Sequence, residues 1–386
     1  MSSTVPTAPS AATASARPWL RRVDDALGRP VSMRAMALLR VLVGPIVLLH
    51  LRPLLEDAWH GRLPRDVFHH PYAGWYPELP RAAYVAMLWL AALAAVAMTI
   101  GLVTRVATAT VWLIVTYDLF LSTTNFHNNR AYLVIVLAAL AVTPCGRELS
   151  VDAWWRARRG LAGLPTVSPA WPLWLLRFEA STVYGASGLS KLLDHDWASG
   201  TVTWHRVVLQ RARLESSVLP GWAVDVLTNR SFHTFAAKVV IATELFIALG
   251  LWWRTRNVAV WIAVCFHVTI QLTASVEVFS YLAIAALVIW SVPSTRDRLL
   301  EIDPSDAAQR HFARGVGALD WLARFRVQHG APGSPVRVVD RDGRVHVGGR
   351  AVRFACSRLP ATAWFALPTL ITFGRSRPIH TTEETP

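Results

Sequence analysis

Cysteine is scarce in this 386-residue sequence, and its scarcity excludes two classes of site. The three cysteines, Cys145, Cys265 and Cys356, lie far apart, so no pair has the spacing of a zinc site or of a CxxC redox motif. Their positions imply no disulfide framework either. Cys145 and Cys265 fall within apolar runs, where we expect buried thiols.

Charged residues are also scarce, at 17% of the chain against roughly 25% in a typical soluble domain. Hydrophobic residues make up 53%, and the 18 tryptophans are typical of a protein that meets membrane interfaces. The net charge of +14 alone would suit nucleic acid. The arginines lie mostly between apolar runs, however, where they signal topology and contact lipid headgroups. We therefore expect a multi-pass protein of the cell membrane, with the lipid bilayer and not nucleic acid as its partner.

The N-terminal stretch, residues 1–16, is rich in Ser, Thr, Ala and Pro and predicts a disordered tail. It lacks the basic start and short apolar core of a secretory signal peptide. Arginines then gather within residues 17–34, and by the positive-inside rule they place the N-terminus in the cytoplasm. Residues 17–30 predict an amphipathic helix on the membrane surface. We assign 1–29 to a disordered or amphipathic N-terminal segment.

Apolar segments then recur and predict an all-α transmembrane bundle of about eight spans, which we assign to residues 30–298. Arginine clusters within 147–159 and 296–298 predict cytoplasmic loops, so both termini face the cytoplasm and residues 194–229 lie outside. The expected spans are 36–55, 83–103, 106–122, 131–145, 171–193, 235–253, 257–275 and 276–292.

From about residue 300 the composition becomes that of a soluble domain, and we assign 299–386 to a small cytoplasmic α+β tail. Residues 305–325 predict a helix that Ser305 caps. Residues 335–352 predict a β-hairpin that turns at Asp342-Gly343. The last residues, 376–386, predict disorder.

Ionisable residues inside apolar spans are costly, so they are functional candidates by default. His267 and Gln271 stand one helical turn apart and share a face, which suits either a ligand or a packed histidine. Arg177 and Glu179 do not face each other, and Arg177 is expected to pair with Glu244 across helices, as structural glue or as part of a site. The remaining candidates of this kind are Asp118, Lys191, Lys238 and Glu277.

Lys191 lies near the expected outer end of its span and has two interpretations. A lysine at this position can be an anchor that extends to the interface. It can also be a general base, because burial disfavours the ammonium form. The stretch "NFHNNRAYL" offers a similar choice, since Asn128, Asn129 and Arg130 suit an anionic or carbonyl ligand or a cap of the fourth span.

Three segments resemble a known family. "LLRFEASTVYGASGLSKLLDHDWASG", with Tyr184 and Lys191, is similar to the lysine-bearing helix of the vitamin K-dependent γ-glutamyl carboxylases, which belong to the wider horizontally transferred transmembrane (HTTM) family. "NFHNNRAYL" resembles that family's Asn-Asn-His-x-Tyr-Leu element, with Arg130 in the histidine position. "FHVTIQLTASVEVFSYL" resembles its helix of histidine and polar residues.

The resemblance implies a chemistry and a site toward the outer face. In the carboxylases a lysine deprotonates reduced vitamin K, and the base made from it with oxygen allows a glutamate to be carboxylated. Lys191 matches that lysine and His267 a histidine of the quinone-facing helix. The resemblance thus implies Lys191 as the catalytic base, reduced vitamin K or another quinol as cofactor, and a secreted peptide as partner. Asn128, Asn129, Arg130, Arg177, Glu179, Tyr184, Glu244, His267 and Gln271 would hold substrate or cofactor.

Two other functions stay open. Some HTTM proteins resemble non-catalytic partners in the maturation, export or immunity of secreted peptides, and the bundle would then supply a lipid or peptide groove. A small-molecule transporter is the third, although hydropathy shows no inverted repeat. The tail segment "DRDGRVHVGGRAVRFACSRLPATAWFALPTL" is also similar to the second half of DCC-type thiol-oxidoreductase-like domains, without the CxxC half.

Overall fold

The computed structural model describes residues 18–62, 70–216, 219–274, 278–291, 298–359 and 362. The tails expected at 1–16 and 376–386, and Glu277, lie outside these residues. The fold is mostly helical, at 69%, and a small sheet occurs near the C-terminus. The expected helical bundle with an α+β C-terminal part is therefore confirmed.

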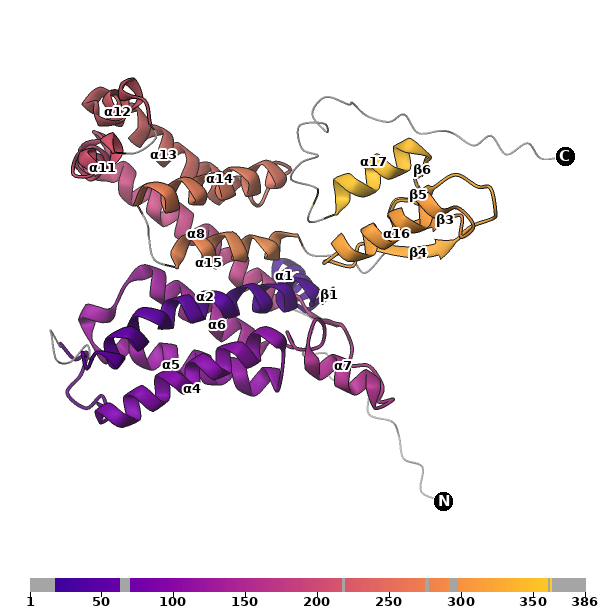
Figure 1. Ribbon diagram of the computed structural model, residues 1–386, viewed down its shortest axis with the longest axis horizontal. Coiled ribbons are helices and arrows are strands. Elements are labelled where there is room, and N and C mark those ends of the chain that lie inside the picture. Colours follow the sequence, from indigo (N-terminus) through magenta and orange to yellow (C-terminus); the bar gives the residue numbers. More distant parts are fainter. Residues whose placement is uncertain are drawn as a thin grey trace, which may run out of the picture.

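The expected spans all fall on helices of one bundle, in which the helix axes run mostly along one direction (Figure 1). Among the described residues, four helices are long and apolar enough to cross a membrane: α2, α4, α5 and α13. The figure of about eight spans stays a prediction. The bundle helices are α2 (Arg34–Trp59), α4 (Arg81–Ile100), α5 (Thr104–Leu121), α6 (Asn128–Val142), α8 (Trp171–Leu193), α13 (Arg230–Gly250), α14 (Arg256–Ala274) and α15 (Phe279–Ala286), which continues as the 3-10 turn η3 (Leu287–Trp290).

Neighbouring helices pack in two groups, which α8 and α15 connect, since α15 contacts α2 and α6 as well as α14 (Figure 1). One group is the antiparallel series in which α2 packs on α4, α4 on α5 and α5 on α6. In the other, α13 packs against α8 and α14, and α14 packs against α15. Because α8 contacts both α6 and α13, its side chains reach both groups. One core of apolar side chains runs through the bundle.

A fully buried arginine ties the first group together. The Arg40 guanidinium on α2 donates hydrogen bonds to the carbonyls of Met98, of Thr99 at 2.9 Å, of Cys145 at 3.3 Å and of Leu149 at 2.5 Å. The last carbonyls of a helix lack partners within it, and a cation there also complements the helix dipole. Arg40 therefore satisfies the end of α4 and the segment after α6, a role that its place in an apolar run did not reveal.

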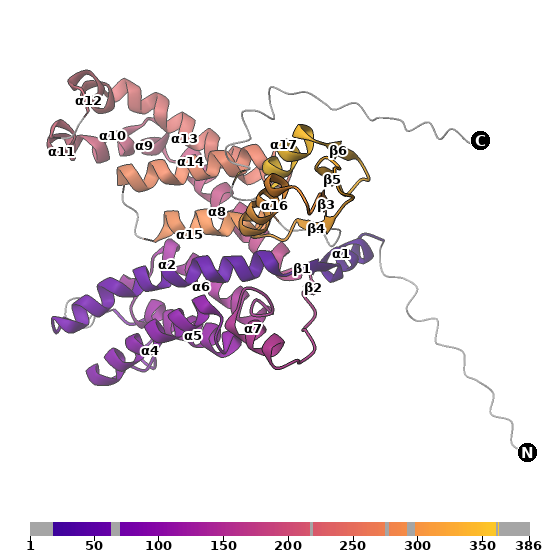
Figure 2. The ribbon, with the colours of Figure 1, turned by 45° about the vertical axis from the view of Figure 1, so that its right-hand side comes forward.

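The two ends of the bundle carry different structures. The short helices between α8 and α13 lie at one end, and at the other lie the C-terminal domain and α1 (Pro18–Gly28), as two views agree (Figures 1 and 2). α1 buries no residue and exposes Trp19, Leu20 and Val23, which fits the expected amphipathic surface helix. The remaining short elements are α7 (Val151–Arg158), α9 (His195–Ala198), α10 (Thr201–Val208), α11 (Arg211–Glu215), α12 (Gly221–Thr228), the 3-10 turn η2 (Thr123–Asn125), and the paired strands β1 (Pro30–Ser32) and β2 (Val167–Pro169).

The C-terminal domain is a four-stranded sheet in the order β4-β3-β5-β6, with helices α16 and α17. β3 and β4 are parallel and are joined through α16, as a parallel pair requires a crossover. The other pairings are antiparallel, and Leu300, Val316, Val338 and Ala355 are in its separate core. The elements are β3 (Arg298–Ile302), α16 (Ala307–Leu319), β4 (Phe325–His329), β5 (Arg337–Val339), β6 (Val345–Val347) and α17 (Gly349–Arg358).

Several local expectations are corrected here. The expected hairpin is confirmed, with Gly343 at φ +81° in the turn between β5 and β6. The helix expected over 305–325 is shorter, because Asp306 and not Ser305 caps it and the chain enters β4 at Phe325. Cys145 is buried as expected, whereas Cys265 is exposed on the outside of the bundle.

Candidate functional site

A buried ion pair joins α8 to α13. The Nζ atom of Lys191 lies 2.8 Å from Oε1 and 2.7 Å from Oε2 of Glu244, and it also donates to the Ser187 hydroxyl at 2.5 Å. That hydroxyl in turn donates to Glu244 Oε1 at 3.1 Å. The side chains of Lys191 and Glu244 are 16% and 6% exposed. Lys191 therefore turns into the bundle and does not extend to an interface as an anchor would.

Small residues on α8 allow this close pairing. A Cβ atom on Gly188 would lie 3.0 Å from Leu245 Cδ2 and 3.2 Å from Glu244 Cβ, so α13 lies closer than a larger residue allows. Gly185, one turn earlier, faces Ala248 at an ordinary 3.7 Å. Small residues bring membrane helices together in this way. Gly188, about one turn before Lys191, thus sets how closely Glu244 on α13 approaches α8.

The acids after Lys191 act on the next helix. Asp194 ends α8 and caps α9, where its Oδ1 accepts a hydrogen bond from the Trp197 backbone N–H at 3.1 Å. This cap places the Trp197 ring beside Lys191, whose Nζ lies 5.1 Å from the ring centroid. A cation near a tryptophan face is stabilised by it. Asp194 is therefore the N-cap of α9 and positions a third neighbour of the lysine.

A second buried polar contact lies two turns earlier on α8. The Tyr184 hydroxyl and His267 Nε2 are 2.6 Å apart, and both side chains are buried. His267 Nδ1 has no hydrogen-bond partner among the described residues, nor has Gln271 Oε1 one turn further along α14. Tyr184, Ser187 and Lys191 follow one stripe of α8, at helical spacing. α8 therefore presents a tyrosine to α14 and a lysine to α13.

An aromatic cluster brings together the segments that resemble family motifs. The ring of Phe279 lies 5.4 Å from that of His267 and 6.4 Å from that of Tyr132, centroid to centroid. Tyr184 and His267 are 5.6 Å apart by the same measure. Tyr132 belongs to α6, Tyr184 to α8 and His267 to α14. Segments far apart in the sequence therefore meet at one place in the bundle.

The start of α6 differs from the expected amide cap, whereas the expected ligand site stays a prediction. The cap is His127, whose Nδ1 accepts the Asn129 backbone N–H at 3.2 Å, so the amide side chains do not cap the helix. Asn128 is exposed and Asn129 is buried. Arg130 donates to the Asn125 carbonyl at 3.4 Å. Its guanidinium is therefore held at the base of η2.

Asp118 makes a polar contact near the same end of α6. It is 2% exposed and accepts a hydrogen bond from the Tyr84 hydroxyl at 2.6 Å. Its backbone carbonyl accepts the Asn125 side-chain amide at 3.0 Å. Asp118 and Arg130 thus share Asn125 as a common neighbour, and α4, α5 and α6 meet around it.

The expected Arg177–Glu244 pair is wrong. Arg177 donates through Nε and Nη2 to the Ile289 carbonyl, at 3.2 and 2.9 Å, and its guanidinium lies 5.2 Å from the Trp290 ring centroid. Glu244 belongs to Lys191 instead. Glu179 is half-buried and makes no hydrogen bond or ion pair with any described residue. Arg177 therefore stabilises the end of η3 and is not part of the lysine pair.

Four neighbours of the site were missed as candidates: Ser187, Tyr132, Phe279 and Trp197. Ser187 precedes Lys191 by four residues, so helical spacing alone would have found it. Tyr132 and Phe279 lie inside the stretches that resemble family motifs. For Trp197 the sequence carries no such signal, because its place depends on the turn at Asp194.

The residues suit some ligands better than others. Within the described ranges no cluster of His, Cys, Asp or Glu could hold a metal ion. The donors around Tyr184 and Lys191 have the chemistry to contact quinol oxygens. However, the cavity beside Tyr132 and Tyr184 measures about 10 Å³, whereas ligand pockets have volumes of about 300–1,000 Å³. A quinone ring does not fit this cavity, so a quinol would have to reach Lys191 from the exposed part of the lysine side chain.

The apolar helices and their buried polar pairs define an integral membrane helical bundle. Within that class, the chain belongs to the HTTM domain family, whose model matches residues 28–294. That match spans the whole helical bundle. No curated protein and no solved structure is detectably similar to the chain.

Proposed function

We propose that this HTTM protein is a membrane enzyme in which Lys191 and Glu244 form an intramembrane proton-exchange site of the carboxylase-like kind. The observation that carries the proposal is the position of Lys191 Nζ, within 2.8 Å of both Glu244 oxygens. At this distance a proton can pass directly between the acid and the amine. The proposed substrate is a lipid-soluble compound with an acidic hydroxyl group. The resemblance to the carboxylases names reduced vitamin K or another quinol as such a compound.

The chemistry follows from the pair. An ammonium group cannot accept a proton, so Lys191 acts as a base only after its own proton has moved to Glu244. The two groups are already in hydrogen-bond contact, so this transfer needs no movement of either side chain. The Ser187 hydroxyl bonds to both groups and can follow the proton. A substrate would meet Lys191 from the exposed part of its side chain.

The proposed placement in the membrane follows the arginines. Eight crossings, with both termini in the cytoplasm, put α9 to α12 outside and the C-terminal domain inside. The division into a segment 1–29, a membrane domain 30–298 and a tail 299–386 goes with this placement. Lys191 then faces the outer half of the bilayer, from which a secreted peptide or another substrate could approach.

The test compares the two lysines of the chain. Purified protein in liposomes is supplied with reduced vitamin K under oxygen, and quinol oxidation is followed by absorbance. We expect Lys191→Ala and Glu244→Gln to lower the rate by about 100-fold or more, as loss of a general base does. Lys238→Ala, at an exposed position of α13, should match wild type. Full activity of the Lys191→Ala variant would overturn the proposal, and inactivity of wild type would remove the quinol class.

A non-catalytic role is the second candidate, and the closed geometry of the pair favours it. Lys191 and Glu244 satisfy each other, and the cavity next to Tyr184 is small. Under this hypothesis the pair specifies helix packing, and the bundle serves a secreted peptide as a maturation, export or immunity partner. Co-purification of one peptide, equal in wild type and Lys191→Ala, would favour this role over catalysis.

A further inference from the structure

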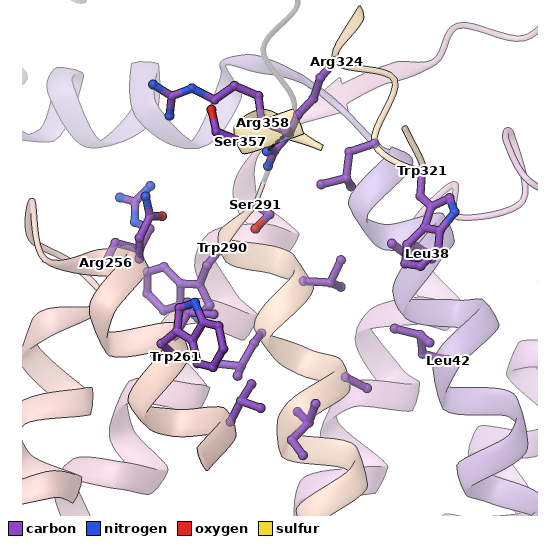
Figure 3. Close-up of a pocket in the computed structure, with 18 residues that line it drawn as sticks. Leu38, Leu42, Arg256, Trp261, Trp290, Ser291, Trp321, Arg324, Ser357 and Arg358 are labelled. Atoms are coloured by element: carbon purple, nitrogen blue, oxygen red, sulfur yellow. Dashed lines mark hydrogen bonds between the residues drawn. The ribbon is translucent and has the colours of Figure 1, made fainter. Parts of the chain in front are cut away.

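A cavity of about 440 Å³ lies between the helical bundle and the C-terminal domain (Figure 3). This volume is within the range of small-molecule sites, about 300–1,000 Å³. α2 contributes Leu38 and Leu42, and α14 contributes Val260, Trp261 and Val264. It is separate from Lys191, since none of the residues around that lysine lines it.

The cavity is apolar on one side and cationic on the other. Its bundle side is formed by leucine, isoleucine, valine, alanine and tryptophan side chains of α2, α14, α15 and η3. Arg324 and Arg358 face it from the C-terminal domain, and Arg256 faces it from the first turn of α14 (Figure 3). Val264 lies two turns after Arg256, about 12 Å along the helix. The cavity therefore extends from these three arginines into the apolar part of the bundle.

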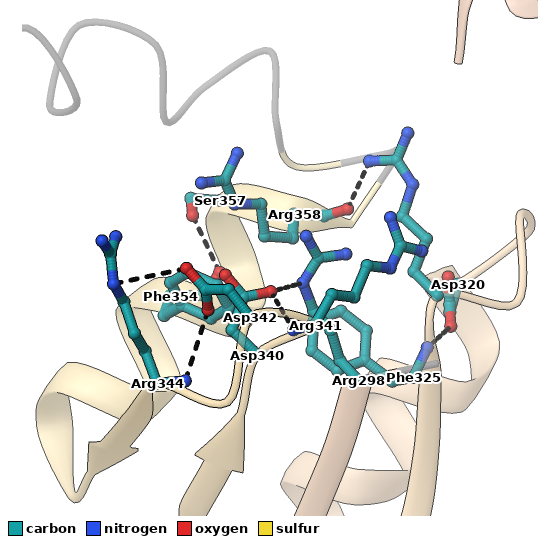
Figure 4. A network of polar contacts seen from close by, with 11 residues as sticks. Arg298, Asp320, Phe325, Asp340, Arg341, Asp342, Arg344, Phe354, Ser357 and Arg358 are labelled. Atoms are coloured by element: carbon teal, nitrogen blue, oxygen red, sulfur yellow. Dashed lines mark hydrogen bonds and ion pairs between the residues drawn. The ribbon is translucent and has the colours of Figure 1, made fainter. Parts of the chain in front are cut away.

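The nearby carboxylates interact with other groups, although Oδ1 of the buried Asp320 has no hydrogen-bond partner among the described residues (Figure 4). Asp340 accepts the Arg298 guanidinium at 2.8 Å, Asp342 pairs with Arg344 at 3.3 Å, and Asp320 accepts the Phe325 backbone N–H at 2.8 Å. Within the described residues, no carboxylate stands at ion-pair distance from the three arginines of the cavity. Within the described residues these three arginines therefore have no ion-pair partner, and Arg256 and Arg324 donate instead to the carbonyls of Leu251 and Arg358.

Two further observations indicate that this cation cluster is unbalanced. Burial first, and then the neighbouring arginines, lower the pKa of Arg324 to about 10 and also lower the pKa of Arg358. The buried Arg358 Nε and Trp290 Nε1 atoms have no hydrogen-bond partner among the described residues. Buried donors normally have partners. An anion in the cavity would supply both the missing charge and the missing acceptors.

We propose that this cavity binds a phosphorylated amphiphile, such as an anionic phospholipid, with its phosphate on Arg256, Arg324 and Arg358 and its apolar chain between α2, α14 and α15. Guanidinium groups match phosphate oxygens in geometry as well as charge. A water-soluble phosphate compound would leave the apolar side unused, whereas an amphiphile fills both. Basic pockets beside membrane helices take lipid headgroups in this way.

The ligand would also bridge the two parts of the molecule. One direct hydrogen bond between them runs from Arg34 Nε on α2 to the Trp321 carbonyl of the C-terminal domain, at 2.6 Å. Trp321 and Leu322 line the cavity from the C-terminal domain. A lipid bound to both sides adds contacts that are lost if the domain moves away. Binding should therefore stabilise the full-length protein as a whole.

The experiment measures binding and thermal unfolding of delipidated full-length protein in a neutral detergent. Phosphatidylglycerol is titrated against three comparison compounds: diacylglycerol, phosphatidylcholine and inorganic phosphate. We expect phosphatidylglycerol to bind and to raise the unfolding temperature, with no comparable effect of diacylglycerol or inorganic phosphate. Equal stabilisation by inorganic phosphate would overturn the amphiphile, and equal binding of diacylglycerol would overturn the role of the arginines. Weaker binding of phosphatidylcholine than of phosphatidylglycerol is expected, and equal binding would overturn the requirement for net negative charge.

Variants locate the site. Arg324→Gln combined with Arg358→Gln should weaken phosphatidylglycerol binding at least about tenfold, because two charge-assisted contacts are lost. Arg326→Gln is the matched control, since Arg326 is exposed on β4 and does not line the cavity. Val264→Trp fills the apolar part and leaves every arginine in place, so it tests the site even if the double variant misfolds. Unchanged binding in the Val264→Trp variant would overturn the proposal.

Discussion

At the scale of single residues, the effect of a buried charge on stability depends on whether it has a partner of opposite charge. The side chains of Lys191 and Glu244 are only 16% and 6% exposed, and they hydrogen-bond to each other and to Ser187. A pair of this kind contributes little net stability when intact, yet removal of one member leaves the other charge buried and unpaired. The stability of the bundle should therefore respond to single and paired substitutions in different ways.

We expect Glu244→Leu alone to destabilise the protein by about 3 kcal/mol, because the Lys191 ammonium would stay in an apolar site without its partner. The double variant Lys191→Met/Glu244→Leu should recover most of that loss. Thermal unfolding in detergent, followed by circular dichroism, measures both. A double variant that loses as much as the two single variants together would show that the pair is not coupled.

Tyr184 should matter for its hydroxyl and not for its ring. Tyr184→Phe keeps the contact with the His267 ring but removes the partner of Nε2, so a buried polar atom loses its hydrogen bond at a cost of about 1–3 kcal/mol. Tyr132→Phe is the matched control, since it keeps the contact with Phe279 and the hydroxyl of Tyr132 makes no hydrogen bond with a described residue. Equal unfolding temperatures for the two variants would show that the Tyr184–His267 bond adds nothing.

At the scale of elements, the site depends on how closely α8 and α13 approach. The ion pair forms across this interface, and Gly188 stands where any side chain would meet Leu245 and Glu244. A larger residue must move α13, and Glu244 moves with it. The geometry of the lysine site is therefore a property of the helix pair as well as of its polar residues.

Gly188→Leu should destabilise the bundle by about 2 kcal/mol, in the range that overpacking of a well-packed core costs. It should also abolish any activity that needs Lys191. Gly185→Ala, one turn earlier, adds a methyl group at 3.7 Å from Ala248 and should be neutral. Unfolding temperatures and the quinol assay are measured on both. If Gly185→Ala were as harmful as Gly188→Leu, the close approach at Gly188 would not be the cause.

The sequence predicted the positions of the helices well, but it did not predict which buried polar residues pair across helices, for a physical reason. Hydropathy and helical spacing are local, so every expected span falls on a helix and the turn at Asp342-Gly343 is found. The choice of Lys191 and not Arg177 as the partner of Glu244 is decided by which helices pack together. The same holds for Arg40, because its four carbonyl partners come from two other segments, the end of α4 and the residues after α6.

At the scale of the whole molecule, the two ends of the bundle have different compositions and so suggest different surroundings. α1 and the C-terminal domain lie at one end (Figure 2). The arginines of the cavity come from this domain and from the start of α14. The short helices α9 to α12 lie at the other end. An even number of crossings is needed for α1 and the C-terminal domain to share one side of the membrane. The shared end agrees with termini on one side of the membrane, and the arginine pattern is the basis for proposing that this side is the cytoplasm.

Labelling of one introduced cysteine at a time tests this topology in intact cells with a maleimide that does not cross membranes. Arg211→Cys, on the exposed helix α11, should label from outside. Arg22→Cys on α1 and Arg326→Cys on β4, both at exposed positions, should label only after the membrane is permeabilised. The wild-type chain with its own three cysteines provides the blank. Labelling of the α1 and β4 variants from opposite sides would mean an odd number of crossings, and labelling of all three from one side would mean that α11 does not face away from the C-terminal domain.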